Sequence, residues 1–574
     1  MKTQFKAASR TDGSILVLVL AFLTLSLAVL GAALSWTTNN SRATERNNQL
    51  FRTTAAAEAA TEKVVTYLAN DFRREGESLV SANLDTYRLL VPNSTENAAW
   101  GSYEFYDITG NSGHTHVESI PPLSDFRNLS SQYRGLRGWA SAFRVVSRAR
   151  DTRSSLNITA AVRQDIEVAV IPLFQFAIFY NLDLEINPGP VMTVTGPVHC
   201  NSTIYMQPQN TLTFQSDVTA AGDIIHDKKP GDPLVRTPGS INYRGEHDAG
   251  VSSLNLPIGT NNSPAAVRQV VEVPPGTEDP NSAMGKERFY NKADMIVTVT
   301  DTAIVAKSGR YNNFATVIPE SQATQFVNTG VQFYNKRESK TVKATQIDIG
   351  KLAQWNGTNT LLRPILPLRD VRTVYVVDMR TQSGTTEPGV RLVNGQSLLP
   401  KGLTIATPHP AYIKGNYNVP DAYLGTLDTS ATVGASVVAD AITILSSAWN
   451  DANSASGLGS RIAANTTVNA ALLAGIVQTI SGSYSGGVEN FPRFLEDWGG
   501  KTLTYNGSMV VLFESRTATG EWRGTTGPDI YNPPNRNWAF DTNFRDVNKL
   551  PPATPCVRAL VRGSWAMVKP DGSG

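Results

Sequence analysis

The stretch GSILVLVLAFLTLSLAVLGAAL, residues 13–34, decides the fold of this 574-residue chain. No charged residue occurs between Asp12 and Arg42, and three cations precede the stretch: Lys2, Lys6 and Arg10. About 20 apolar residues, rising 1.5 Å each in a helix, span a bilayer core of about 30 Å. The sequence therefore predicts a transmembrane helix over residues 14–36, with the N-terminus on the cytoplasmic side.

The helical pattern continues beyond the expected membrane edge. The segment TTAAAEAATEKV, residues 53–64, is rich in helix-forming residues, and no proline occurs before Pro92. Apolar side chains recur at helical spacing, namely Leu50, Ala57, Val64 and Leu68. These features predict an amphipathic helix over residues 37–92 that continues the membrane helix into water.

Three interpretations of the N-terminus remain open at this point. A cleaved secretory signal would have its small-residue site at Gly31 to Ala33, but the apolar run exceeds the usual 7–15 residues. A plain membrane anchor is the second interpretation. The third is a pilin-type helix, which the continuation of the helix into water favours.

The short basic leader, the glycine, the apolar helix and the following AAAEAATEKV segment together resemble type IV pilin-like proteins with a PilX-type N-terminal domain. The resemblance implies that a prepilin peptidase cuts between Gly13 and Ser14. It also implies that the apolar helix contacts membrane lipid and other pilin-like subunits. The residues that would do so are Ile15, Leu16, Leu18, Leu20, Phe22, Leu25, Leu27 and Leu30.

Two positions depart from the major pilins of that family. Ser14 stands where they begin with Phe or Met, and Leu18 stands where they carry a glutamate. In a pilus this glutamate offsets the positive N-terminus of a neighbouring subunit, where an unpaired charge would be costly. A chain without it is expected to be a minor subunit, at a tip for example, or an anchored pilin-like protein outside any pilus.

The remainder of the chain has a β-rich pattern. From Leu182 onward, strands of about four residues alternate with Gly, Pro or Asn. This rhythm suits a β-solenoid, with a β-sandwich as the alternative. The apolar run from Val168 to Tyr180 is too short to cross a membrane and is expected to be a buried connector. The expected fold class is α+β and mostly β, with a β-solenoid, a side-lobe insertion and flanking helices.

Two further helices are expected in the second half of the chain, over residues 430–449 and 466–480, and they would cap the solenoid. The expected organisation is a leader (1–13), a transmembrane helix (14–36), an amphipathic helix (37–92), a mixed connector (93–181), a first solenoid block (182–227), an inserted lobe (228–370), a second solenoid block (371–420), a helical flank (421–500) and C-terminal strands with a Pro/Asn-rich tail (501–574).

Composition excludes several functions. The net charge of +2 argues against a nucleic-acid partner, whose binding proteins are strongly basic. Two cysteines are too few for a Cys-built zinc or iron–sulfur site. Cys200 and Cys556 either form a disulfide in an oxidising periplasm or are two isolated buried thiols.

No common catalytic motif is present, so the chain is expected not to be an enzyme and to need no cofactor or metal. Asp223, His226 and Asp227 form a weak candidate cation site, and His114 with His116 a weaker one; solvated loops are the simpler interpretation of both. Carboxylates on neighbouring solenoid turns keep a polysaccharide-cleaving alternative open, namely Asp183, Glu185, Asp217 and Asp223.

The sequence therefore favours a single-pass inner-membrane protein with its bulk in the periplasm or at the cell surface. In this reading it is a structural, pilin-like subunit of a type IV pilus or related assembly. The alternative is an anchored envelope protein whose β-rich domain binds or cleaves polysaccharide.

Overall fold

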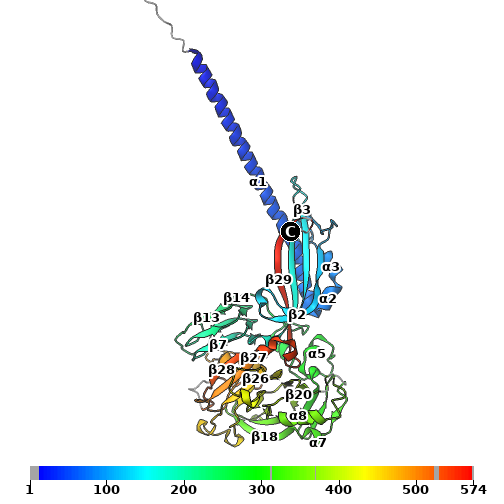
Figure 1. The fold of residues 1–574 in the computed structure, drawn as a ribbon, viewed down its shortest axis with the longest axis vertical. Coiled ribbons are helices and arrows are strands. Elements are labelled where there is room, and N and C mark those ends of the chain that lie inside the picture. The colour runs from blue at the N-terminus through cyan, green and yellow to red at the C-terminus, as the bar shows by residue number, and fades with distance from the viewer. Residues whose placement is uncertain are drawn as a thin grey trace, which may run out of the picture.

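The computed structural model describes residues 12–310, 313–366, 368, 370–522, 529–569 and 571. A long N-terminal apolar helix projects from the rest of the chain, and a large, mostly β region lies at the opposite end of the molecule (Figure 1). Between them, a small antiparallel sheet packs against the lower half of the helix.

Helix α1 (Asp12–Glu75) has 64 residues and includes both predicted helical segments up to its end. It stops at Gly76, whose φ of 86° is a left-handed conformation that glycine adopts without strain. Two short helices follow, α2 (Glu77–Ala82) and α3 (Leu84–Arg88). The prediction of one helix as far as residue 92 is therefore wrong beyond Glu75. There the chain folds back on α1, where Asn83 donates a 2.8 Å hydrogen bond to Asp71.

The antiparallel sheet has the order β1-β3-β4-β29, with β2 paired to β3. Four of its strands come from the region predicted as a mixed connector, and the fifth comes from the C-terminal end of the chain. The strands are β1 (Tyr103–Tyr106), β2 (His116–Asn128), β3 (Arg137–Asp151), β4 (Thr159–Pro172) and β29 (Cys556–Val568).

The large region is inserted between the two strands β4 and β29, which pair with each other. The two ends of the insertion meet where the Leu173 amide donates to the Pro555 carbonyl at 2.9 Å. The apolar run predicted as a connector crosses this junction, since it comprises the end of β4, η3 (Leu173–Gln175) and β5 (Ile178–Tyr180), and it is almost wholly buried.

The first part of the insertion forms three parallel stacks of short strands. Equivalent residues are 20 apart in the first coils, so that the Gln207 amide donates to the Asn187 side chain of the coil before it. Each coil of the chain contributes one strand to each stack. The strands are β5, β8 (Val198–Cys200), β11 (Val218–Ala220) and β14 (His247–Ala249); β6 (Leu184–Ile186), β9 (Ile204–Met206) and β12 (Ile224–Ile225); and β7 (Met192–Val194), β10 (Leu212–Phe214) and β13 (Ile241–Tyr243).

The first stack continues into a 13-stranded sheet of order β14-β11-β8-β5-β27-β26-β24-β22-β20-β15-β16-β17, with β28 paired to β27. The chain enters this sheet at β5 and coils outward to β14. It then crosses to the other half of the sheet, where β15, β16 and β17 form the far end, and coils back through β20 until β27 pairs with β5. The added strands are β15 (Met295–Val299), β16 (Ile304–Ser308), β17 (Val317–Ile318), β20 (Thr373–Asp378), β22 (Leu403–Ala406), β24 (Ala435–Ala439), β26 (Thr466–Ile476), β27 (Thr502–Glu514) and β28 (Asn535–Phe540).

A second sheet of order β18-β19-β21-β23-β25 accompanies the returning coils. Its strands are β18 (Val327–Asn335), β19 (Lys340–Asp348), β21 (Thr386–Val393), β23 (Ala411–Lys414) and β25 (Ile442–Leu445). The short helices of the insertion are α4 (Pro264–Arg268), α5 (Ala283–Glu287), α6 (Phe289–Lys292), α7 (Glu320–Ala323) and α8 (Ile349–Thr358). The 3₁₀ turns besides η3 are η1 (Ala98–Ser102), η2 (Ser131–Tyr133), η5 (Asp421–Tyr423), η6 (Asp451–Asn453), η7 (Leu458–Ser460), η8 (Val488–Asn490), η9 (Thr542–Arg545) and η10 (Val547–Lys549).

The two helices predicted over 430–449 and 466–480 are wrong, because these segments contain the strands β24, β25 and β26. Their apolar residues matched a helical spacing only because strands buried on both faces are apolar at nearly every position. The predicted side lobe also differs from the structure: β13 and β14 extend the first coils, and β15 pairs with β20 in the main sheet.

One buried carboxyl of the insertion is imperfectly paired. Glu387 of β21 is 1% exposed, and its Oε1 accepts hydrogen bonds from Asn335 at 3.2 Å and Tyr412 at 3.4 Å. Among the described residues its Oε2 has no partner. Burial, together with the nearby Glu338 carboxylate, raises the pKa of Glu387 from 4.5 to about 7.

We expect Glu387→Gln to stabilise the protein at pH 8 and to have little effect at pH 5. Because the pKa is higher in the folded state, the wild-type protein loses stability as the pH rises from about 4.5 to 7, by about 2–4 kcal/mol. The neutral glutamine avoids this loss. Thermal unfolding at both pH values measures the effect, with the exposed Glu58→Gln as control. An equal shift at pH 5 and pH 8 would contradict the assignment.

Candidate functional site: the apolar half of helix α1

The N-terminal part of α1 is apolar and has no protein partner. Every large apolar side chain from Ile15 to Trp36 is more than half exposed. Within the part of the chain that the structure describes, α1 is the one helix long and apolar enough to cross a membrane by length and composition. Exposure of apolar surface of this extent to water is unfavourable.

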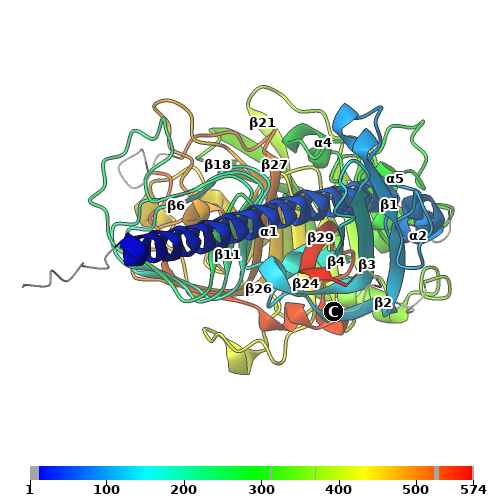
Figure 2. The same cartoon turned by 90° about the horizontal axis from the view of Figure 1, so that it is seen from above.

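A polar segment separates this half from the docked half of the helix. Residues 37–48 are all exposed and contain no large apolar side chain. In the view from above, α1 is inclined toward the side of the coils that contain β6 and β11 (Figure 2). The apolar half therefore stands clear of the rest of the molecule.

The docked half of α1 packs on the antiparallel sheet along one face. At the upper end, small side chains allow a close approach, since Ala56, Ala57 and Ala60 lie against Phe105, Ala149 and Val162. Further down, Val64, Leu68 and Phe72 join a cluster with side chains of β2, β3 and β4. These helix positions recur every three or four residues, which places them on one side of α1.

Polar contacts join both sides of the docked half of α1 to neighbouring segments of the chain. On one flank, Lys63 donates to the Val91 carbonyl at 2.8 Å and pairs with Glu96 at 2.5 Å. On the other, Arg562 of β29 binds both carboxylate oxygens of Glu62. Such exposed ion pairs contribute little stability by themselves, but they fix the rotation of the helix on the sheet.

The antiparallel sheet is in turn fixed to the large region. The buried core of the insertion includes Leu129, Tyr133 and Leu136 of the sheet end. Gln175 of η3 accepts from the Arg137 amide at 2.8 Å and donates to its carbonyl at 2.7 Å. The direction of the apolar half is therefore set relative to the whole β-rich body.

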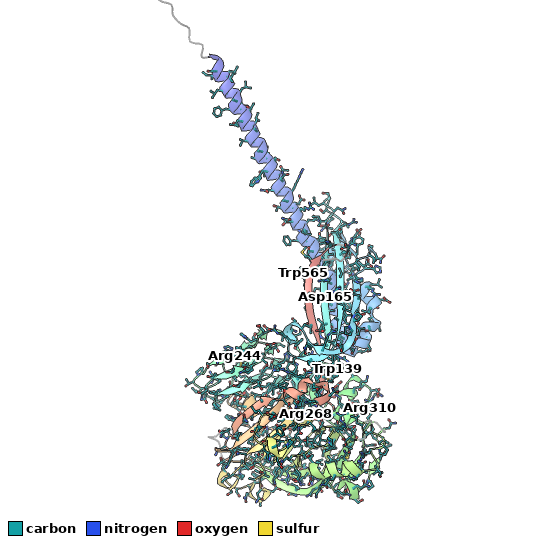
Figure 3. All side chains as sticks on the ribbon, viewed as in Figure 1. Trp139, Asp165, Arg244, Arg268, Arg310 and Trp565 are labelled. Atoms are coloured by element: carbon teal, nitrogen blue, oxygen red, sulfur yellow. The ribbon has the colours of Figure 1, made fainter. Side chains whose placement is uncertain are left out.

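An exposed apolar patch lies beside the point where α1 leaves the sheet; we call Phe51, Trp565 and Met567 the lateral patch. Phe51 is 75% exposed, Trp565 46% and Met567 50%. Phe51 precedes Glu62 by about three helical turns, so it lies on the same side of α1 as the Arg562 contact. Trp565 and Met567 follow Arg562 on β29. Trp565 lies close to the emerging helix (Figure 3).

The sequence-predicted residues of the apolar helix all lie in the exposed half. Gly13 and Ser14 are within the first turn of α1, whereas residues 1–11 of the predicted leader lie outside the described residues. Leu18 is 58% exposed. The lateral patch was not predicted, because the pairing of β29 with β4 is not visible in the local sequence.

Of the two alternatives for the cysteines, the structure has the free thiols. Cys200 is in β8, where its Sγ contacts the Leu182 carbonyl at 3.1 Å, and Cys556 begins β29. Burial raises the pKa of each thiol to about 12, so neither is activated as a nucleophile. The disulfide hypothesis is therefore not supported.

The four carboxylates of the glycan-cleaving alternative do not gather in one cleft. Asp183 pairs with Lys229 at 2.8 Å, and Glu185 accepts from Thr479 at 2.6 Å and Ser485 at 2.9 Å. These two line a cavity of about 20 Å³, which has room for one water molecule but not for a sugar ring. Asp217 accepts from the Glu246 amide, and Asp223 is exposed.

The weak cation-site candidates have other partners. His226 contacts the Tyr243 hydroxyl at 3.0 Å, His114 contacts the Ser112 carbonyl at 2.8 Å, and His116 lies 3.5 Å from Glu118. Among the described residues, no group of three or more His, Cys, Asp or Glu side chains is arranged to hold a metal ion.

Comparison with known proteins gives little further information. No protein-family model and no curated protein matches the chain. Among solved structures, one similar chain is the competence-associated pilin ComZ from Thermus thermophilus, which is 11% identical. The match covers 90% of this chain and 97% of that chain, with a TM-score of 0.29. A score this low does not establish a common fold.

We expect Leu25→Arg to weaken membrane association of the full chain. A cation near the centre of a membrane-spanning helix disfavours insertion by about 2.5–3.5 kcal/mol. Leu89→Arg is a matched control, because Leu89, directly after α3, is 61% exposed and Leu25 on α1 is 62% exposed. Membrane flotation measures the effect. Equal flotation of both variants and the wild type would contradict a membrane role for this half of α1.

Proposed function

We propose that this chain is a pilin-like structural subunit, anchored in the inner membrane by the apolar half of α1. The observation that carries the proposal is that one helix has two environments. Every large apolar side chain of one half is more than half exposed, and the other half is fixed to a sheet. The exposed half has the length to span a bilayer and can exchange lipid for the apolar helices of other subunits. The β-rich body would then lie in the periplasm or at the cell surface.

The position of the body supports a minor, terminal place in a filament. The large region lies across the end of the antiparallel sheet that is opposite the apolar tip of α1 (Figure 1). A further subunit stacking at that end would need the space that this region occupies. A second argument comes from Leu18, which stands where major pilins have a glutamate. The chain therefore lacks the carboxylate that is expected of a repeating subunit.

The lateral patch supports side-by-side contact with another subunit. Phe51, Trp565 and Met567 are exposed next to the point where α1 emerges. A neighbouring helix that covers the exposed half of α1 and continues past the polar segment 37–48 would reach this patch, because Phe51 follows that segment on α1. Burial of large apolar side chains contributes about 1.5–3 kcal/mol each to such a contact.

For the insertion we propose a β-solenoid that is displayed by the anchor and has a structural rather than a catalytic role. Three parallel stacks with equivalent residues 20 apart support the solenoid. The one-water cavity at Asp183 and Glu185 favours structure over glycan cleavage at those residues.

Processing of the leader tests the pilin-like assignment. In cells that contain a prepilin peptidase, we expect the mature chain to begin at Ser14, and a Gly13 substitution to leave the chain uncut. N-terminal sequencing or intact mass of the membrane-extracted chain measures the cut. A chain that is left uncut, or that is cut near Gly31, would contradict the assignment.

The lateral patch gives a second test. We expect Trp565→Ser with Met567→Ser to reduce co-purification with other pilin subunits about tenfold while leaving membrane anchoring intact, since the loss of two apolar contacts costs more than 1.4 kcal/mol. Met379→Ser is the control, because Met379 is 63% exposed in the large region. Unchanged co-purification of the double variant would exclude the patch from assembly.

A further inference from the structure

Two adjoining cavities form an open groove on the large region. The first, of about 710 Å³, lies between α6, the start of β20 and residues 552–553. The second, of about 480 Å³, lies between residues 400–402, residues 432–434 and η10. Arg372 lines both, so the two cavities are continuous at this side chain.

Cations predominate along the groove. The first cavity is lined by Lys292, Arg310 and Arg372, and the second adds Lys401 and Lys549. Lys292 pairs with Glu287 at 2.6 Å. Among the residues that the structure describes, none of the other four cations has a carboxylate within 4.0 Å; these are Arg310, Arg372, Lys401 and Lys549.

The neutral contacts of these cations use only part of their donor capacity. Arg372 uses its Nε to donate to the Lys401 carbonyl at 3.0 Å, and Lys549 donates to the Asn543 side chain at 3.0 Å. A guanidinium has five N–H donors and an ammonium three, so each retains unused capacity for an anionic acceptor.

The two carboxylates in the groove are occupied by other donors. Asp294 accepts from the backbone amides of Arg372 at 2.8 Å and Thr373 at 2.9 Å. Asp370 accepts from the Asn356 side chain. Both therefore help to fix the wall of the groove. Arg372 interacts electrostatically with both carboxylates and Lys401 with Asp370, but none of these pairs is a direct ion pair within 4.0 Å among the described residues.

The remaining lining favours a sugar polymer over a nucleic acid. Two polar side chains of the lining that are not buried, Thr432 and Asn548, are suited to sugar hydroxyls, whereas Asn291 and Thr373 are only 4% and 2% exposed. None of the described lining residues is aromatic, whereas proteins that bind single-stranded nucleic acid stack bases on aromatic rings. The whole chain has a net charge of only +2.

We propose that this groove binds a carboxylate-bearing polysaccharide, with Arg372 at its centre and Lys401 and Lys549 along its second half. Spaced cations match the regular carboxylates of an acidic sugar chain, and two joined cavities suit several consecutive sugar units. This binding goes beyond the proposed assembly role and does not depend on it, since the groove lies in the insertion, remote from the apolar half of α1.

The test uses the full-length chain in detergent, with fluorescent oligogalacturonate as the probe and a neutral glucan of the same length as comparator. We expect saturable binding of the acidic probe alone, which weakens as salt rises. Arg372→Gln, and separately the exposed pair Lys401→Gln with Lys549→Gln, should each raise the Kd about tenfold or more. Thermal unfolding of each variant checks that the fold is retained. Because Lys401 and Lys549 are exposed, weaker binding by their double variant cannot come from a structural effect at Arg372.

A charge-matched control comes from the same domain. Arg244→Gln with Lys351→Gln removes two exposed cations outside the groove, and Arg244 lies on the opposite side of the large region from Arg310 (Figure 3). Its Kd should stay within about twofold of the wild type. The proposal is overturned by absent binding of oligogalacturonate, by equal weakening in groove and control variants, or by tighter binding of a DNA duplex to the same residues.

Discussion

Helix α1 is exposed and apolar in its N-terminal half and packed on a protein sheet in its C-terminal half. The rest of the structure depends on this constraint. From Ile15 to Trp36 its large side chains are apolar and exposed, while from Thr53 to Phe72 one side is buried on a sheet. A helix exposed along its whole length would be free to swing. The docked half removes that freedom, because its alanines approach the sheet closely and its larger apolar side chains fill the remaining space.

The antiparallel sheet that receives α1 is completed by the last strand of the chain. β29 pairs along nearly the whole of β4, and its Arg562 binds Glu62 of the helix. The large insertion begins and ends at this strand pair, so both of its connections are fixed to the sheet. This closure explains how a domain of several hundred residues can be carried on one helix without a flexible linker among the described residues.

The insertion obtains its stability from stacking. Each short strand buries its apolar side chains against the equivalent residues of the next coil. Polar side chains at equivalent positions also contact each other, as in the hydrogen bond that Asn201 donates to Asn181. The chain begins in the middle of the main sheet and finishes beside its starting strand, when β27 pairs with β5. The basic groove lies along the segment that leads from the last coils into β29, where loops rather than stacked strands form the surface.

The apolar run from residue 13 to 34, the continuation of its helix beyond the run and the β-rich nature of the remainder were determined by sequence alone, because each depends on local composition and periodicity. The end of the helix at Gly76 was not predicted. The helices predicted over 430–449 and 466–480 were wrong because a strand buried on both faces lacks the alternation that distinguishes it from a helix. The partner of β4, the free state of Cys200 and Cys556, the lateral patch and the meeting of cations around Arg372 join residues far apart in the chain. Only the tertiary structure decided these, since the interactions that bring them together leave no periodic signal in the sequence.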